Sequence, residues 1–281
     1  MNLSEKAMLV NLSISQWTAR KYDRKVSSEV NAAHGAKDDA GRYNKSLVAR
    51  ESLKDIQRIV NQARILHYEK TLPWFDEGAR ILPAAMFSEY STAMRQLRGE
   101  FETVVRDFSD AYPVLIDEAR VALNGLFNVQ DYPPAEMIRG KFDWRVSISP
   151  LPNADDFRVQ LSDDEIETVR KEIEARAGDA AEMANKDLWE RLYKVVSNMA
   201  DKLVIPDAIF RNSLVENIGE LTSMLPKLNI TNDANLEDMR RKVESKLAAS
   251  NPEVLRTDSI VRRETASDAQ ALLEAMKGYM G

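Results

Sequence analysis

Two long apolar stripes with helical spacing, separated by a proline-containing excursion, constrain this chain more than any other feature of its sequence. The first stripe runs from Met86 to Leu115 and the second from Ile166 to Leu203, with apolar residues three and four positions apart. That spacing is typical of the buried face of an amphipathic helix. We therefore predict two long helical arms, joined by the excursion over residues 126–161.

The excursion and the N-terminus hold the strongest candidates for β structure. Apolar and polar residues alternate over 144–148 and over 157–161, and they also alternate near the N-terminus over 10–15, within a predicted strand over 9–15. A lone hairpin is marginally stable in water, so the two strands of the excursion need a third strand or a helix to cover them, and residues 9–15 are the obvious third strand. The predicted fold class is therefore mainly α, with long antiparallel helical arms and a small antiparallel β-sheet of three strands.

Local signals indicate where the arms begin, bend and end. An interior proline costs a helix on the order of 3 kcal/mol, so Pro113 predicts a kink or break near Tyr112. Ser162 and Glu165 have the spacing of a capping box at the start of the second arm. Pro206 closes that arm, and the predicted domains are accordingly 1–205, with the arms and the sheet, and 206–281, a C-terminal helical unit.

Two further helices are predicted in the first third of the chain. Tyr22, Val26 and Val30 stand four residues apart, which indicates a helix over 17–30. Ser46 is a suitable cap for the next helix, which ends before Leu72 because a residue that precedes proline is disfavoured in helical conformation.

Composition and charge exclude several classes of protein. The chain is 44% hydrophobic and 30% charged, which fits a folded, charge-rich helical protein. It has no cysteine, so disulfides and cysteine zinc sites are excluded. Apolar runs too short to span a bilayer and an N-terminus unlike a signal peptide predict no membrane partner and a cytoplasmic location. The net charge of −6 argues against non-specific nucleic-acid binding, although a local basic patch remains compatible with it.

The residue types that usually carry chemistry do not form a recognisable site. His34 and His67 are the only histidines, and structural or solvated roles explain both. The acids of 163–167 suit either a divalent-metal or general-acid site or the start of a helix, and we favour the helix start. Glycine-rich phosphate loops do not occur. We expect no enzyme activity, no catalytic residues, no cofactor and no metal.

Basic and aromatic clusters offer two possible binding surfaces. Arg240–Lys242 and Arg262–Arg263 could contact phosphates, but nearby acids favour solvated helix faces with local ion pairs. The segment Leu72-Pro73-Trp74-Phe75 places bulky side chains in a connection between helices. Leu72, Trp74 and Phe75 are the predicted partner-binding residues. The alternative, which we favour for this segment, is that they fill the end of the helical core.

Three segments carry a resemblance to a known family. They are Leu12-Ser13-Ile14-Ser15-Gln16-Trp17-Thr18-Ala19-Arg20-Lys21-Tyr22-Asp23, His67-Tyr68-Glu69 with Leu72-Pro73-Trp74, and Asp155-Asp156-Phe157-Arg158-Val159. With them, most of residues 9–200 resembles an uncharacterised family of tailed-bacteriophage and bacterial proteins that is catalogued as a domain of unknown function. The resemblance implies a phage or prophage origin and, as a partner, a MoxR-like AAA+ ATPase encoded nearby. It implies no catalytic residue.

The expected function is a non-enzymatic phage interaction or assembly protein that forms homo-oligomers in the cytoplasm of the infected host cell. Long amphipathic arms, able to pack as a coiled coil, carry more apolar stripe than a short bundle covers, which motivates self-association. The first alternative is an adaptor of the AAA+ ATPase. The second is a nucleic-acid-binding protein, although nucleic acid is not the partner that we expect.

Overall fold

The computed structural model describes residues 3–75, 78–153, 162–206 and 208–279 and contains two compact units. Unit 1 comprises Met1–Asn11, Tyr68–Ser88 and Ser147–Gly281, and unit 2 comprises Leu12–His67 and Glu89–Val146. This division differs from the predicted boundary after residue 205, because the chain on both sides of Pro206 belongs to unit 1. Nearly all of the first predicted arm lies in unit 2, and the second lies in unit 1.

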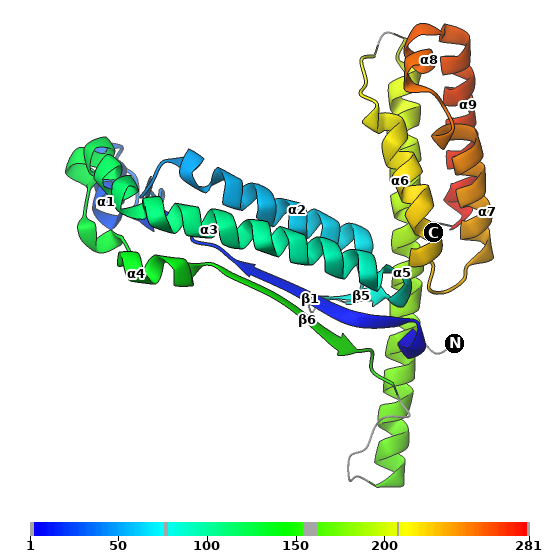
Figure 1. Cartoon of the computed structure of the whole chain (residues 1–281), viewed down its shortest axis with the longest axis horizontal. Coiled ribbons are helices and arrows are strands. Elements are labelled where there is room, and N and C mark those ends of the chain that lie inside the picture. The colour runs from blue at the N-terminus through cyan, green and yellow to red at the C-terminus, as the bar shows by residue number, and fades with distance from the viewer. Residues whose placement is uncertain (1–2, 76–77, 154–161, 207, 280–281) are drawn as a thin grey trace. The chain divides into compact units, whose positions relative to one another are not determined.

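The fold is mainly α, with long helices and a small antiparallel sheet, as predicted (Figure 1). The helices are α1 (Arg24–Ala33), α2 (Lys54–Lys70), α3 (Phe87–Leu123), α4 (Ala135–Ile138), α5 (Asp163–Val204), α6 (Ser213–Leu228), α7 (Ala234–Val243), α8 (Pro252–Thr257) and α9 (Ser259–Met276). The strands are β1 (Ala7–Ser15), β2 (Arg20–Tyr22), β3 (Asn44–Ser46), β4 (Leu72–Pro73), β5 (Ala79–Pro83) and β6 (Asp143–Pro150).

The main sheet has the strand order β4-β5-β1-β6. β5 pairs antiparallel with β1, with Ala7 opposite Pro83, and with β4, with Leu72 opposite Ile81. β1 and β6 confirm the strands predicted at 9–15 and 144–148, and the third predicted strand, 157–161, lies outside the described residues. The sequence did not indicate β4 and β5, because both are short and contain a proline, which usually demotes a strand assignment.

Aromatic side chains fill the core of unit 2. Along the buried face of α3, Phe101 packs against Trp144 at 5.3 Å between ring centroids, and Phe108 packs against Phe142 at 5.6 Å. Such tilted and edge-on pairs add about 0.5–1.5 kcal/mol each to the apolar burial. They fix the apolar stripe of the first arm against the start of β6 and the residue before it.

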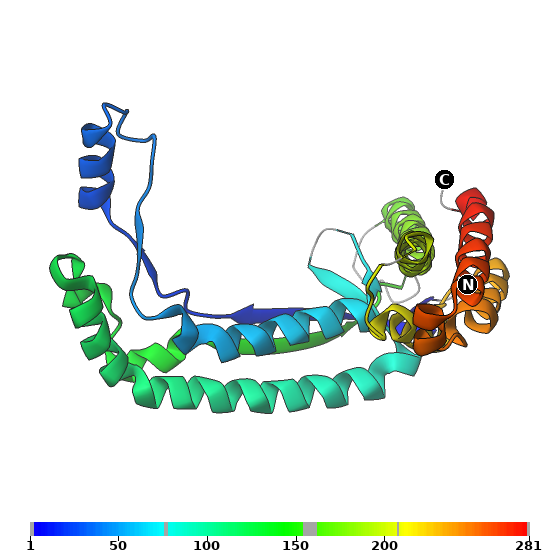
Figure 2. The same cartoon turned by 90° about the horizontal axis from the view of Figure 1, so that it is seen from above.

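Pro113 does not break α3. The helix is continuous from Phe87 to Leu123, and it bends toward its C-terminal end (Figure 2). The predicted change of direction therefore occurs within an unbroken helix. The proline removes a single donor, the one that would bond the carbonyl of Ser109, so the helix can bend and continue.

The helix predicted over 17–30 begins only at Arg24. Asp23 is its N-cap, and its Oδ1 accepts a hydrogen bond from the backbone nitrogen of Val26 at 3.1 Å. The residues before it form β2, which pairs antiparallel with β3, so Ser46 lies in a strand rather than at a helix cap. This two-stranded ribbon leads to α1 (Figure 2).

Unit 1 is organised around the 42-residue helix α5, with α6 and α9 alongside its C-terminal half (Figure 1). The buried stripe of α5 begins at Ala180 and ends at Leu203. At the start of α5, the backbone nitrogen and hydroxyl of Ser162 donate to Glu165 at 3.0 and 2.6 Å. These bonds lower the pKa of Glu165 and confirm that this acidic segment starts the helix.

Asp233 joins α7 to α5. Its carboxylate caps α7 through the nitrogens of Asn235 and Leu236, and it accepts hydrogen bonds from Asn185 Nδ2 at 2.9 Å and Trp189 Nε1 at 3.2 Å. Asp233→Ala removes the cap and unpairs two donors, so the free energy of unfolding should fall by about 2 kcal/mol in urea denaturation at pH 7.

The effect of Asp233→Ala should depend on pH. Burial raises the pKa of Asp233, but the hydrogen bonds that it accepts outweigh burial and lower it below 3.8. The stability that the Asp233 carboxylate contributes is therefore present above pH 3.8 and lost as the pH falls through its folded-state pKa. The free energies of unfolding of wild type and Asp233→Ala should accordingly converge in acid. The matched control is Asp238→Ala, which removes an exposed ion pair of α7 and should change stability by less than about 0.5 kcal/mol.

Candidate functional site

The candidate site is the end of unit 1 where α5 passes into α6, hereafter the α5–α6 end. It includes the described residues of the connection, 205–206 and 208–212, together with α8 and the first turn of α9. Arg262 of α9 donates to the carbonyl oxygens of Leu203 and Ile205 at 3.2 and 2.5 Å, and Arg256 of α8 donates to that of Phe210 at 3.2 Å. These bonds bring segments from three parts of the sequence together.

Large aliphatic side chains are exposed at this end. The exposed fractions are 96% for Ile209, 67% for Val204, 60% for Ile260 and 54% for Ile205. A single exposed aliphatic residue is ordinary on a protein surface. Four of them on the segments that meet at one end of a bundle are typical of a surface that binds another protein.

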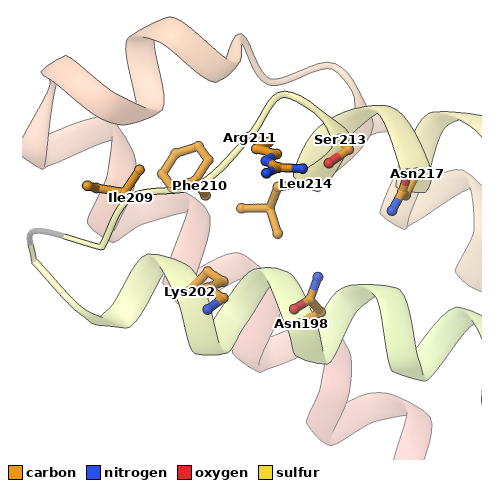
Figure 3. A pocket seen from close by; sticks show the side chains of 8 residues that line it. All are labelled: Asn198, Lys202, Ile209, Phe210, Arg211, Ser213, Leu214 and Asn217. Atoms are coloured by element: carbon orange, nitrogen blue, oxygen red, sulfur yellow. The ribbon is translucent and has the colours of Figure 1, made fainter. Parts of the chain in front are cut away.

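An open hollow of about 290 Å³ lies beside Ile209. It is lined by Asn198, Lys202, Ile209, Phe210, Arg211, Ser213, Leu214 and Asn217. Figure 3 shows Asn198 and Lys202 rising from α5 toward Leu214 and Asn217 of α6. The hollow is at the small end of the range for small-molecule sites, and most of its lining side chains are exposed. It can hold one or two apolar side chains, with Lys202 and Arg211 available to acidic groups.

Phe210 is the buried anchor of the connection. The guanidinium carbons of Arg256 and Arg262 lie 5.2 and 5.5 Å from its ring centroid, which is the geometry of cation–π contacts. These contacts hold the connection close to α8 and α9. Because Phe210 is held in this way, the side chain of the preceding residue, Ile209, points into solvent from a backbone that is anchored beside it.

The basic clusters differ from each other. Arg240, Arg241 and Lys242 pair with acids of their own helical segment, such as Glu237 at 2.8 Å from Arg240, which confirms the predicted ion pairs. Arg262 was expected on a solvated face, and this expectation is wrong, because its side chain is buried and bonds carbonyl oxygens. Arg263 is exposed, as expected.

The predicted partner-binding residues lie mostly in the interior of unit 1. Leu72 and Trp74 are buried and Phe75 is half-buried, with the guanidinium carbon of Arg176 4.8 Å from the Phe75 ring centroid. A partner would reach Leu72 or Trp74 only after this segment opened. Their burial favours the alternative interpretation, in which they fill the core.

The two histidines occupy different environments. His34 is exposed at the end of α1, and His67 is buried in α2, where its Nδ1 and the hydroxyl of Tyr90 share a hydrogen bond of 2.9 Å. Burial raises the pKa of Tyr90. Across the ranges that the structure describes, no three histidine or acidic side chains are grouped to hold a metal ion. Within those ranges, no helix combines the length and apolarity needed to cross a membrane.

Comparison with known proteins found no relative of this chain. No family model, curated protein or solved structure matches the chain. The resemblance to the phage family therefore rests on the three sequence segments alone. The spacing of Ile209, Phe210 and Leu214 predicts a helix over 207–225 with Ile209 on its apolar face. This prediction is wrong at Ile209, because α6 begins only at Ser213 and Ile209 is exposed.

Proposed function

We propose that this chain is a non-enzymatic interaction protein that self-associates through the α5–α6 end. The observation that supports this proposal is a projecting aliphatic side chain, Ile209, beside an open hollow on the same surface. A two-fold interface pairs one patch with itself, so a patch that carries both a projection and a hollow is self-complementary. The occupant that we propose for the hollow is Ile209 of a second copy.

The first part of α5 supports self-association independently. None of the residues from Asp163 to Asp179 is buried, although Ile166, Val169 and Ile173 follow one another at helical spacing. These three side chains are half-buried, and an apolar stripe that its own chain covers only in part is the feature from which coiled coils are built. This segment is a second contact face in the proposed oligomer.

The cellular setting that we propose is the cytoplasm of a phage-infected cell, and it rests on the sequence resemblance. In that setting the protein is an assembly factor without catalytic activity. A MoxR-like AAA+ ATPase is the other proposed partner. A pull-down from infected cells tests that partner, and recovery of the chain without any ATPase would contradict it.

Ile209→Glu should dissociate the oligomer. Burial of one isoleucine side chain contributes about 1.5–3 kcal/mol, and a two-fold interface buries two copies. We therefore expect the dimer dissociation constant to rise at least about 100-fold. Size-exclusion chromatography with multi-angle light scattering over micromolar concentrations measures the change. Since Ile209 is almost fully exposed within its own chain, circular dichroism at concentrations where both proteins are monomeric should show the same melting temperature for wild type and variant.

Two further variants locate the contact. Val121→Glu, at an aliphatic residue of α3 that is 81% exposed, is the matched control and should leave the mass unchanged. Ile173→Glu tests the stripe of α5. A monomeric wild type contradicts self-association, and loss of the oligomer with Ile173→Glu but not with Ile209→Glu contradicts the proposed role of the α5–α6 end.

A further inference from the structure

The ribbon β2–β3 and the first turn of α1 present a basic surface in unit 2. All three residues of β2, Arg20, Lys21 and Tyr22, are exposed. Side chains alternate along a strand, so Arg20 and Tyr22 share one face of the ribbon. Arg42 adds a third group, with its guanidinium carbon 5.9 Å from the ring centroid of Tyr22.

The exposed cations of this surface differ from those of α3 in their acidic partners. Within the ranges that the structure describes, Arg20, Lys21 and Arg24 form no ion pair, whereas exposed arginines of α3 such as Arg98 and Arg106 do. The one acid among them, Asp23, caps α1 and bonds Lys45 at 3.1 Å, so its charge is already compensated. The surface carries a local positive surplus on a chain whose net charge is −6.

The position of Arg24 also disfavours a purely structural role. It is the first residue of α1, where the helix dipole makes a cation unfavourable by some tenths of a kcal/mol. The first turn of α1 contains no acid, as in α9 and unlike those of α5, α6 and α7. An anion bound at this turn would reverse the penalty.

We propose that this surface, formed by Arg20, Tyr22, Arg24 and Arg42, binds single-stranded nucleic acid. The unpaired cations contact phosphates, and the exposed ring of Tyr22 stacks on a base, the combination that non-specific single-strand binders use. A duplex keeps its base faces stacked inside, so it offers Tyr22 no such contact. The ligand class is therefore single-stranded DNA or RNA.

The experiment measures anisotropy of a fluorescent oligothymidylate of 20 nucleotides from 50 to 300 mM salt. Tyr22→Ala should weaken binding about tenfold without changing the salt slope, and Tyr22→Phe should restore it. The plot of log K against log salt has a negative slope, to which each phosphate neutralised by a cation contributes about 0.7 in magnitude. Arg20→Ala/Arg24→Ala should therefore make the slope shallower by about 1.4. Removal of the Arg24 cation should not lower the melting temperature.

The matched control is Arg98→Ala/Arg106→Ala, which removes two paired, exposed arginines of the same unit and should leave affinity and slope unchanged. Three results would overturn the proposal. They are no binding at 50 mM salt, equal losses of affinity in the control and the test variant, and affinity for a duplex of the same length that equals or exceeds that for the single strand. Binding to phosphatidylserine vesicles but not to the oligonucleotide would assign the surface to a membrane and also overturn it.

Discussion

Lys45→Met should lower the free energy of unfolding of unit 2 by about 3–5 kcal/mol, the cost of leaving buried charge without its partner. The side chain of Lys45 is 5% exposed, and its ammonium lies 3.1 Å from Asp23 Oδ2 and 2.8 Å from Asp131 Oδ2. It also donates to the carbonyl oxygen of Leu126 at 2.8 Å. One ammonium therefore joins β3, the cap of α1 and the chain that follows α3, and methionine would leave two half-buried carboxylates facing each other.

The pH dependence separates this charge effect from a packing defect. The nitrogen of Val26 and the ammonium of Lys45 lower the pKa of Asp23 below 3.8. The stability from Asp23 is therefore present above pH 3.8 and lost as the pH falls through its folded-state pKa. Below that range the Asp23 carboxyl is neutral, so the Lys45 ammonium no longer stabilises it as an ion pair. The stability difference between wild type and Lys45→Met, measured by urea denaturation at pH 7 and pH 3, should accordingly narrow in acid.

The matched control is Lys21→Met. Lys21 lies directly opposite Lys45 in the ribbon but is exposed, so its replacement should change stability by less than about 0.5 kcal/mol. The double variant Lys45→Met/Asp131→Asn should recover part of the lost stability, because it removes one of the two carboxylates that Lys45→Met leaves without a cation. An equal loss for Lys21→Met and Lys45→Met, or a loss for Lys45→Met that does not change with pH, would contradict the charge explanation.

The long helices could be predicted because their signals are local. The stripe from Ile166 to Leu203 predicted the second arm, and the helix runs from Asp163 to Val204. The apolar period and the capping box of Ser162 and Glu165 both depend on residues within a few positions of one another. Neither signal requires knowledge of the rest of the fold.

The ribbon could not be predicted in the same way. Tyr22, Val26 and Val30 have helical spacing, but Tyr22 and Val30 are exposed and contribute nothing to a core. The chain pairs as β2–β3 where Lys45 meets Asp131, a residue far along the sequence. A contact between distant residues therefore overrides a local periodicity of only three positions.

The candidate site illustrates the same limit. Whether Ile209 is covered or exposed depends on how the connection is folded, and the sequence shows only that apolar residues are there. The acids beside Arg262 in the sequence suggested that its side chain lies on a solvated face. The hydrogen-bond acceptors of Arg262 are instead carbonyl oxygens 54 to 60 residues earlier in the chain, which no local pattern reveals.

Arg262→Met should lower the free energy of unfolding of unit 1 by about 3 kcal/mol, since hydrogen bonds from a charged donor contribute about 1.5–3 kcal/mol each and are only partly additive. Arg262 is buried and donates to the carbonyl oxygens of Lys202, Leu203, Ile205 and Ala208. The first two lie in the last turn of α5, whose carbonyls have no partner within the helix. The positive guanidinium is also favourable at this negative end of the helix dipole.

Methionine preserves most of the length and apolar contact of the arginine, so the loss should arise from the unpaired carbonyls. Arg263→Met, at the exposed neighbour, is the control and should be nearly neutral. Hydrogen exchange adds a local readout, in which the amides of Ala208 and Leu214, both bonded within the connection, should exchange faster in Arg262→Met alone. Unchanged exchange there would contradict the assigned role. Because the same carbonyls position Ile209, this variant should also weaken self-association, whereas Ile209→Glu should weaken self-association without loss of stability of the monomer.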